Sequence, residues 1–164
     1  TVRYAQLFKC EQVLRSDCNR GVSGIEGSTS TAAGAACVGE EMTVLITGDM
    51  SFSYDVNGLS STYLSPRFKI IVMCNGGGGI FRFIKPTSDL PELETCFEIH
   101  RDISVEKYAD LFGLRYFELN DEKSAAEVLS LFFAEKDRPA ILAVHTPNVY
   151  NVEVLRGYFR RSRQ

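Results

Sequence analysis

The chain has 164 residues, a length that suits one domain with its own hydrophobic core. It carries 18 Lys and Arg residues against 21 Asp and Glu residues, for a formal net charge of -3. The basic residues form no run long enough to follow a phosphate backbone, which argues against a nucleic-acid partner. The arginines at 156–163 fit the end of a helix, where cations offset the helix dipole.

The cysteine pattern is typical of a reducing compartment. Five cysteines are an odd number and include no CxxC pair, so we expect neither a disulfide framework nor a zinc site. No apolar run approaches the length of a membrane span, and we expect a soluble, cytoplasmic protein without a membrane partner. Because the chain opens at Thr1 and almost at once in a helical pattern, we also expect it to be part of a longer chain.

The apolar residues change repeatedly between a helical and a strand-like period, which predicts alternating α/β units. In chain order we expect a helix at 1–8, a strand at 12–16, helix 26–38, strand 42–47, helix 56–64, strand 68–74, helix 104–112, strand 114–119, a helix from 120 or 121, strand 140–145 and a helix from 148. Most of the strands are dense in β-branched or aromatic residues, as strands buried on both faces should be. The predicted fold is a three-layer α/β/α sandwich with a mainly parallel sheet.

Polar residues follow two consecutive predicted strands. Asp49 comes after the strand at 42–47, and Asn75 follows the strand at 68–74 about 26 residues later. Consecutive parallel strands end at the same edge of a sheet, so these side chains should lie together. Their oxygens suit a hard cation such as Mg²⁺, and the glycine run at 76–79 lets the backbone approach a ligand. An Asp after a strand is by itself more often a turn or capping residue, and the pair is the more specific signal.

This pair resembles the motif of thiamine-diphosphate enzymes, which reads GDG, a spacer of mid-twenties length, then NN. Met50 stands in place of the third glycine and Cys74 in place of the first asparagine. The sequence GDMS is similar to the version found in menaquinone-pathway synthases, and the second change leaves Asn75 as a ligand. The resemblance implies a thiamine-diphosphate-binding fold.

Three segments, two of which contain this motif, resemble the same synthases in the right order. They are NRGVSGIEGSTSTAAGAA at 19–36, GDMSFSYDVNGL at 48–59 and NGGGGIF at 75–81. The similarity covers most of residues 1–84 and weakens toward the end. It implies that residues 1–164 are the C-terminal, diphosphate-binding domain of a longer enzyme.

The resemblance also implies roles for individual residues. Asp49 and Asn75 would bind Mg²⁺, or Mn²⁺, through side-chain oxygens, and Gly77 through its carbonyl. Ser51 would hydrogen-bond the diphosphate. The aminopyrimidine ring of thiamine diphosphate would contact Gly24 and Ile25.

The implied substrate-binding residues are of two kinds. Arg3 and Arg20 would bind substrate carboxylates, for which the forked guanidinium is suited. Ile80, Phe81 and Ile84 would line the pocket near the thiazolium ring. Without the resemblance, the two arginines would be ordinary surface cations, and Ile25, Ile80 and Phe81 could be ordinary core residues.

The activity implied is that of a transferase that decarboxylates 2-oxoglutarate and adds the resulting carbanion to isochorismate in menaquinone biosynthesis. In these enzymes the glutamate that activates the cofactor lies on an N-terminal domain, and each site forms between that domain of one protomer and this domain of another. We therefore expect no catalytic residue on this domain, a homodimer or larger homo-oligomer, and an inactive domain when it stands alone.

Two other interpretations stay open from the sequence. One is the diphosphate-binding subunit of a two-chain 2-oxo acid decarboxylase, and the other is a metal-free binding module of flavodoxin-like build. Glu26 and Asp55 invite an acid/base role, but Glu26 fits the opening turn of a helix. His100 and His145 have no nucleophile at motif spacing, which disfavours catalysis by histidine.

Overall fold

The computed structural model describes residues 15–19, 21–146 and 148–161. Within these residues, four strands form one sheet in the order β1-β2-β4-β3, and each neighbouring pair is parallel. The strands are β1 (Thr43–Gly48), β2 (Phe68–Cys74), β3 (Arg115–Leu119) and β4 (Ala140–His145). They match the strands expected at 42–47, 68–74, 114–119 and 140–145.

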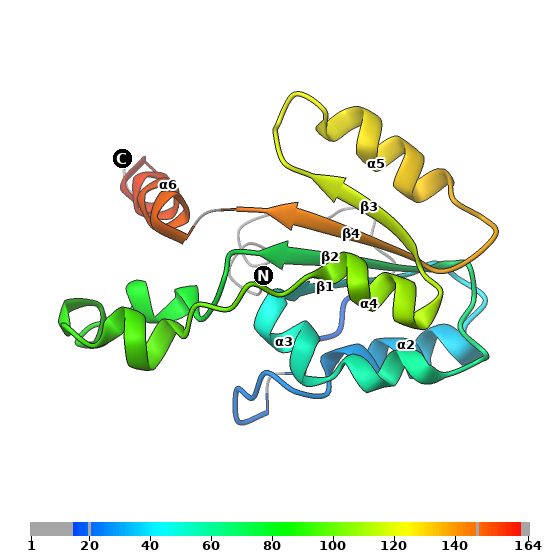
Figure 1. Cartoon of the computed structure of the whole chain (residues 1–164), viewed down its shortest axis with the longest axis horizontal. Coiled ribbons are helices and arrows are strands. Elements are labelled where there is room, and N and C mark those ends of the chain that lie inside the picture. The colour runs from blue at the N-terminus through cyan, green and yellow to red at the C-terminus, as the bar shows by residue number, and fades with distance from the viewer. Residues whose placement is uncertain (1–14, 20, 147, 162–164) are drawn as a thin grey trace.

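Helices cover both faces of the sheet, as Figure 1 shows. One face carries α2 (Ser28–Val38), α3 (Asp49–Tyr54) and α4 (Val105–Phe112), and the other carries α5 (Ala125–Ala134). The last helix, α6 (Asn148–Arg161), extends past the carboxyl ends of the strands. None of the helices in the described ranges is long and apolar enough to span a membrane. The predicted three-layer α/β/α sandwich is confirmed.

Two apolar cores lie on the two faces of the sheet. The larger one packs α2, α3 and α4 against β2 and β4, and its fully buried members include Phe52, Ile70, Val72 and Ile141. The smaller one packs Phe132 of α5 against β4. The larger core lies under the helices that begin at the carboxyl ends of the strands, and it therefore supports the edge where the predicted site lies.

A buried lysine belongs to the smaller side of the sheet. Lys69 of β2 is 1% exposed, and its Nζ donates to the carbonyl oxygen of Glu135 at 2.7 Å. Burial lowers the pKa of Lys69, and the charge of Glu135 acts in the opposite direction. The ammonium group thus satisfies a carbonyl at the end of α5, where the helix dipole favours a cation.

The start and end of α4 follow the sequence signals. The Ser104 hydroxyl accepts the N–H of Lys107 at 3.3 Å, as an N-cap does. Gly113 ends the helix with a φ of +68°, a conformation that glycine adopts without steric cost. The helix expected at 104–112 is therefore confirmed.

Other boundaries differ from the expectation. The sequence predicts a helix at 56–64, whereas the structure has the short helix α3 followed by a 3₁₀ turn, η1 (Val56–Ser60). The helix expected from 120 or 121 begins at Ala125, because the Asp121 carboxylate accepts the N–H groups of Lys123 and Ser124 and forms a turn first. The helix expected at 1–8 lies outside the described residues. Of the strand expected at 12–16, only residues 15 and 16 are described, and neither is in a strand.

Candidate functional site

The residues that follow β1 and β2 meet at the carboxyl edge of the sheet. Gly48, the last residue of β1, is in register with the penultimate residue of β2. Asp49 follows at once, and its Oδ2 accepts the backbone N–H of Asn75 at 3.1 Å and that of Gly76 at 2.7 Å. One carboxylate therefore joins the two halves of the sequence motif, and the predicted proximity of Asp49 and Asn75 is confirmed.

The Asp49 carboxylate is buried in this edge. The residue is 3% exposed, and its Oδ1 also accepts the N–H of Met50 at 2.8 Å. Burial raises the pKa of Asp49, whereas the N–H bonds from Gly76, Met50 and Asn75 lower it. These hydrogen bonds compensate for part of the cost of burying the carboxylate, and a bound cation would compensate further.

The glycine run after Asn75 has a conformation that other residues rarely adopt. Gly76 has a φ of +80° and Gly77 a φ of +151°. A side chain at Gly77 would overlap the carbonyl oxygen of Glu98, and one at Gly78 would come within 2.9 Å of another carbonyl oxygen. The loop therefore packs backbone against backbone, which only glycine permits.

These features fit a site for a hard metal ion. Asp49, at the start of α3, has a carboxylate, Asn75 a carboxamide and Gly77 a backbone carbonyl, and the Asp49 side chain contacts the loop that carries the other two. In the described part of the chain, no group of three or more His, Cys, Asp or Glu side chains could hold a metal ion. A cation at this edge would therefore rely on amide and carbonyl oxygens as well as on one carboxylate, as Mg²⁺ sites next to phosphates do.

Cys74 replaces the first asparagine of the motif at the end of β2. Its side chain is partly buried, and its Sγ lies 3.6 Å from the carbonyl oxygen of Val72. Burial raises the pKa of Cys74 to about 12, and the neighbouring charge of Asp49 adds to the effect. The thiol is therefore protonated at neutral pH, and it is poorly suited to act as a metal ligand or nucleophile.

A second contact ties the segment before α2 to the same edge. The Ser51 hydroxyl, in α3, donates to the carbonyl oxygen of Ile25. Ile25, with Gly24 beside it, thus lies against the helix that begins at Asp49. The three residues predicted to contact the cofactor come together, although their individual roles stay predictions.

Asp55 has a structural position instead of an exposed acid/base one. Its carboxylate accepts the N–H of Ser30 at 2.7 Å and the hydroxyl of Ser30 at 2.5 Å. Ser30 lies in the first turn of α2, which has no side-chain cap from the preceding residue. Asp55 therefore supplies from a distance the acceptor that an N-cap would provide.

The predicted substrate-facing apolar residues follow β2. Ile80 and Ile84 are 48% and 39% exposed, and Ile25 across the edge is 43% exposed. Phe81 is half-buried, with its ring centroid 5.5 Å from that of Phe97. These exposed apolar side chains are available to contact a ligand or another part of a protein. The other two predicted substrate residues, Arg3 and Arg20, lie outside the described residues.

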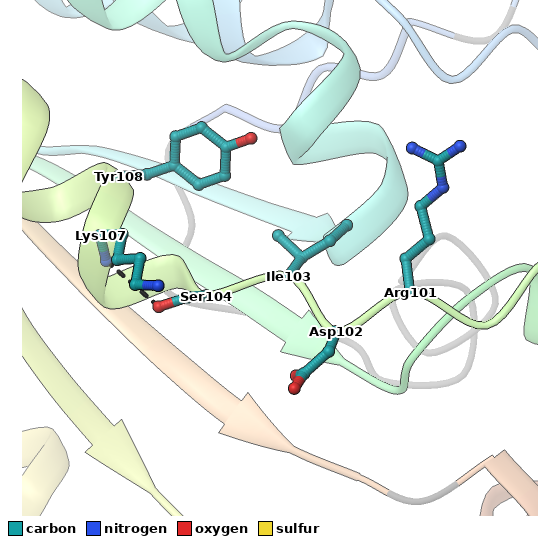
Figure 2. A pocket seen from close by; sticks show the side chains of 6 residues that line it. All are labelled: Arg101, Asp102, Ile103, Ser104, Lys107 and Tyr108. Carbon is teal, nitrogen blue, oxygen red and sulfur yellow. Dashed lines mark hydrogen bonds between the residues drawn. The ribbon is translucent and has the colours of Figure 1, made fainter.

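The structure also shows a hollow that sequence reasoning missed. It has a volume of about 450 Å³ and is formed by the stretch before α4 and the first turns of that helix. Figure 2 shows its lining residues, which are Arg101, Asp102, Ile103, Ser104, Lys107 and Tyr108. Most of these residues belong to a segment without periodicity, and the sequence therefore gave no signal for a concave surface there. Its mixed charges do not select one kind of ligand.

The two histidines lie near carboxylates. His145, at the end of β4, has its Nε2 3.0 Å from the Oε1 of Glu118 on β3. His100 has its Nε2 3.9 Å from the Oε2 of Glu98. The His145–Glu118 pair joins two neighbouring strands and is revealed by the fold, whereas His100 and Glu98 are close in the sequence.

Comparison with known sequences agrees with this geometry. The chain matches the family described as thiamine pyrophosphate enzyme, C-terminal TPP binding domain, over residues 1–144. Three relatives named 2-succinyl-5-enolpyruvyl-6-hydroxy-3-cyclohexene-1-carboxylate synthase match nearly all of it. They come from Porphyromonas gingivalis (47% identity, 96% of this chain), Christiangramia forsetii (42%, 97%) and Flavobacterium johnsoniae (43%, 97%). The chain spans 28%, 28% and 29% of the lengths of these three relatives.

A solved structure has the same fold. The thiamine diphosphate-dependent 4-hydroxybenzoylformate decarboxylase of Rhodococcus jostii RHA1 superposes on 71% of this chain with a TM-score of 0.58 and 20% sequence identity. The match covers 22% of that enzyme. At this identity the likeness concerns the fold alone, and the sequence match carries the assignment. Since that match extends over residues 1–144, this chain belongs to the thiamine pyrophosphate enzyme family and represents its C-terminal TPP binding domain.

Proposed function

We propose that this chain is the diphosphate- and metal-binding domain of a synthase that uses 2-oxoglutarate and isochorismate in menaquinone biosynthesis. The relatives of 42–47% identity share the name of such a synthase, which supports the proposal. The observation that carries it is the contact between the Asp49 carboxylate and the backbone of Asn75 and Gly76. This contact joins the two parts of the motif that give the family its cofactor site.

In this proposal, Asp49, Asn75 and the Gly77 carbonyl hold Mg²⁺ or Mn²⁺, which binds the diphosphate. A metal ion held by these residues would offset the burial of the Asp49 charge and would bind phosphate oxygens. Ser51, whose hydroxyl lies beside the Ile25 carbonyl, contributes to diphosphate binding. When bound, thiamine diphosphate supplies the electron sink for loss of CO₂ from a 2-oxo acid.

The protein's own part is orientation and the exclusion of water. Gly24 and Ile25 support the aminopyrimidine ring. The exposed apolar side chains after β2, with Phe81 between them, keep water from the reacting atoms. Arg3 and Arg20 bind the carboxylates of the substrates through charge-assisted hydrogen bonds.

The remaining parts of the enzyme follow from the length of the relatives. The chain corresponds to 28% of the Porphyromonas gingivalis enzyme, so the proposed activity needs protein outside these residues. We propose that an N-terminal domain of a second protomer supplies the activating glutamate in a cytoplasmic homodimer. The isolated domain is then inactive.

The direct test is an activity assay of the full-length protein that contains this domain. With thiamine diphosphate and Mg²⁺ it should release CO₂ from 2-oxoglutarate and consume isochorismate at equal rates. Release of CO₂ from a small 2-oxo acid without any use of isochorismate would instead indicate a simple decarboxylase. Tight binding of a flavin or an adenine nucleotide, with none of thiamine diphosphate, would contradict the proposal.

A further inference from the structure

The two loops of the proposed site differ in how they are supported. The segment from Asn75 to Ser104 contains no α-helix or strand in the structure, only the turns η2 (Gly79–Arg82), η3 (Thr87–Asp89) and η4 (Leu93–Glu98). It nevertheless carries Gly77 and the apolar residues of the proposed pocket. Its position must therefore depend on contacts other than the backbone hydrogen bonds of a helix or sheet.

One ion pair lies at the centre of this segment. The Arg82 guanidinium donates from Nε to the Glu98 Oε1 at 2.5 Å and from Nη2 to the Glu98 Oε2 at 2.6 Å. The Glu98 side chain is fully buried, and that of Arg82 is 18% exposed. Two parallel hydrogen bonds between a guanidinium and a carboxylate fix the relative orientation of the two groups as well as the distance between them.

The same guanidinium has a second, exposed partner. Its Nη2 donates to the Oε1 of Glu94 at 2.7 Å, but the Glu94 side chain is 66% exposed. Solvent screens such a pair, so it contributes little to the geometry. Glu94 is therefore a matched control for the buried Glu98.

Glu98 also contacts the glycine loop through its backbone. Its carbonyl oxygen accepts the N–H of Gly78 at 2.8 Å, and the same oxygen is the atom that a side chain at Gly77 would overlap. Three residues later, the N–H of Arg101 donates to the carbonyl of Gly76 at 3.2 Å. The position of Glu98 thus determines where the Gly77 carbonyl lies.

The backbone around Glu98 is itself unusual. The turn η4 is a π-helix, and Ile99, directly after it, has a φ of +48°. A β-branched residue rarely adopts the left-handed region and stays there only where its surroundings determine it. On the other side of the pair, the carbonyl of Arg82 accepts a hydrogen bond from Arg156 of α6 at 3.2 Å.

We propose that Arg82 and Glu98 are positioning residues: their buried ion pair sets the Gly77 carbonyl and the Ile80–Phe81 turn in the place that cofactor binding requires. This inference rests on the proposed function of the domain. Buried ion pairs seldom stabilise a fold more than apolar side chains of similar size do. Their geometry, in contrast, cannot be reproduced by apolar contacts.

That difference separates positioning from stability in an experiment. In the full-length protein, the double variant Arg82→Met/Glu98→Leu removes both charges and keeps the bulk. We expect a melting temperature near that of the wild type, together with a Kd for thiamine diphosphate, at saturating Mg²⁺, raised about 10- to 100-fold, as for other residues that orient metal ligands. Calorimetric titration measures the Kd, and a thermal melt measures the stability.

Two single variants keep the test decisive if the double variant does not fold. Glu98→Gln keeps the shape and one acceptor oxygen, and it should weaken cofactor binding. Arg82→Lys keeps the charge without the fork, and it should weaken binding less than Arg82→Met. Glu94→Gln, the control, should leave the Kd unchanged.

Wild-type affinity in folded Glu98→Gln and double variants would overturn the proposal, and so would an equal loss in Glu94→Gln. Failure of the proposed function gives a different result. In that case the wild-type protein itself does not bind thiamine diphosphate, before any variant is compared.

Discussion

The segments that follow β1 and β2 form the two halves of the proposed site, yet the fold holds them in different ways. After β1, Asp49 enters α3 directly, and the buried Phe52 anchors that helix in the larger core. After β2, the chain runs from Asn75 through an irregular stretch in which glycines and the Arg82–Glu98 pair set the backbone.

This difference indicates that the sheet and its core hold the half after β1, whereas side-chain contacts hold the half after β2. A substitution of Asp49, directly after β1, should remove a metal ligand and leave the backbone in place. A substitution in the segment after β2 should shift the Gly77 carbonyl without removing it. Substitutions on the two sides should therefore differ in the size and kind of their effects.

Asp49→Ala should have the largest effect. It removes the one anionic protein ligand of the proposed metal, so the Mg²⁺-dependent affinity for thiamine diphosphate should fall on the order of 100-fold or more. Calorimetric titration of the full-length protein measures this loss. Affinity within a factor of two of the wild type would show that the metal is bound elsewhere.

Gly77→Ala should move the second loop without deleting any side-chain ligand. The new methyl group would overlap the Glu98 carbonyl, and the φ of +151° is unfavourable for alanine, which together should cost about 1–3 kcal/mol. We expect a clear loss of cofactor affinity, smaller than that of Asp49→Ala, measured in the same titration. Gly157→Ala in α6, where a methyl group meets nothing within 4 Å, is the control. Equal behaviour of the two variants would contradict the account of this loop.

Asp55→Ala should affect stability more than binding. The loss of its two hydrogen bonds to Ser30 leaves the first turn of α2 without this cap, at a cost of about 1–2 kcal/mol. Chemical unfolding measures the change, and Ser30→Ala, which removes one of the two bonds, should cost less. Cofactor affinity should fall far less than in Asp49→Ala, although Asp55 lies only a few residues further on. An equal loss of affinity would mean that Asp55, too, is part of the metal site.

Cys74 should give the smallest effect. Because its pKa is raised to about 12, little thiolate forms near pH 8, and alkylation should be slow. The exposed Cys18, Cys37 and Cys96 should react first with iodoacetamide, as followed by mass spectrometry of digested protein. Cys74→Asn, which restores the usual motif, should keep cofactor binding. Fast labelling of Cys74 would show that this edge is more open than in the structure.

The parts predicted from sequence are those with a local signal. Strands β1, β2 and β4 show dense apolar runs, and the proximity of Asp49 and Asn75 follows from their places after two consecutive parallel strands. The short helix α3 was missed because its six residues, DMSFSY, are too few to show a helical period.

The parts not predicted depend on contacts between distant residues. Arg82 and Glu98 are 16 residues apart in a stretch without periodicity, and Asp55 and Ser30 are 25 apart. No local pattern links such partners. The sequence therefore predicted that Asp49 and Asn75 lie together, but not the contacts that hold the segments around them.

The most direct test of the account is a titration of the full-length wild-type protein with thiamine diphosphate, once with Mg²⁺ and once with EDTA. The account predicts saturable binding, one cofactor per chain, that requires the metal and is lost in Asp49→Ala. Binding that is equally strong in EDTA, or that survives Asp49→Ala unchanged, would contradict a metal site built from Asp49, Asn75 and Gly77.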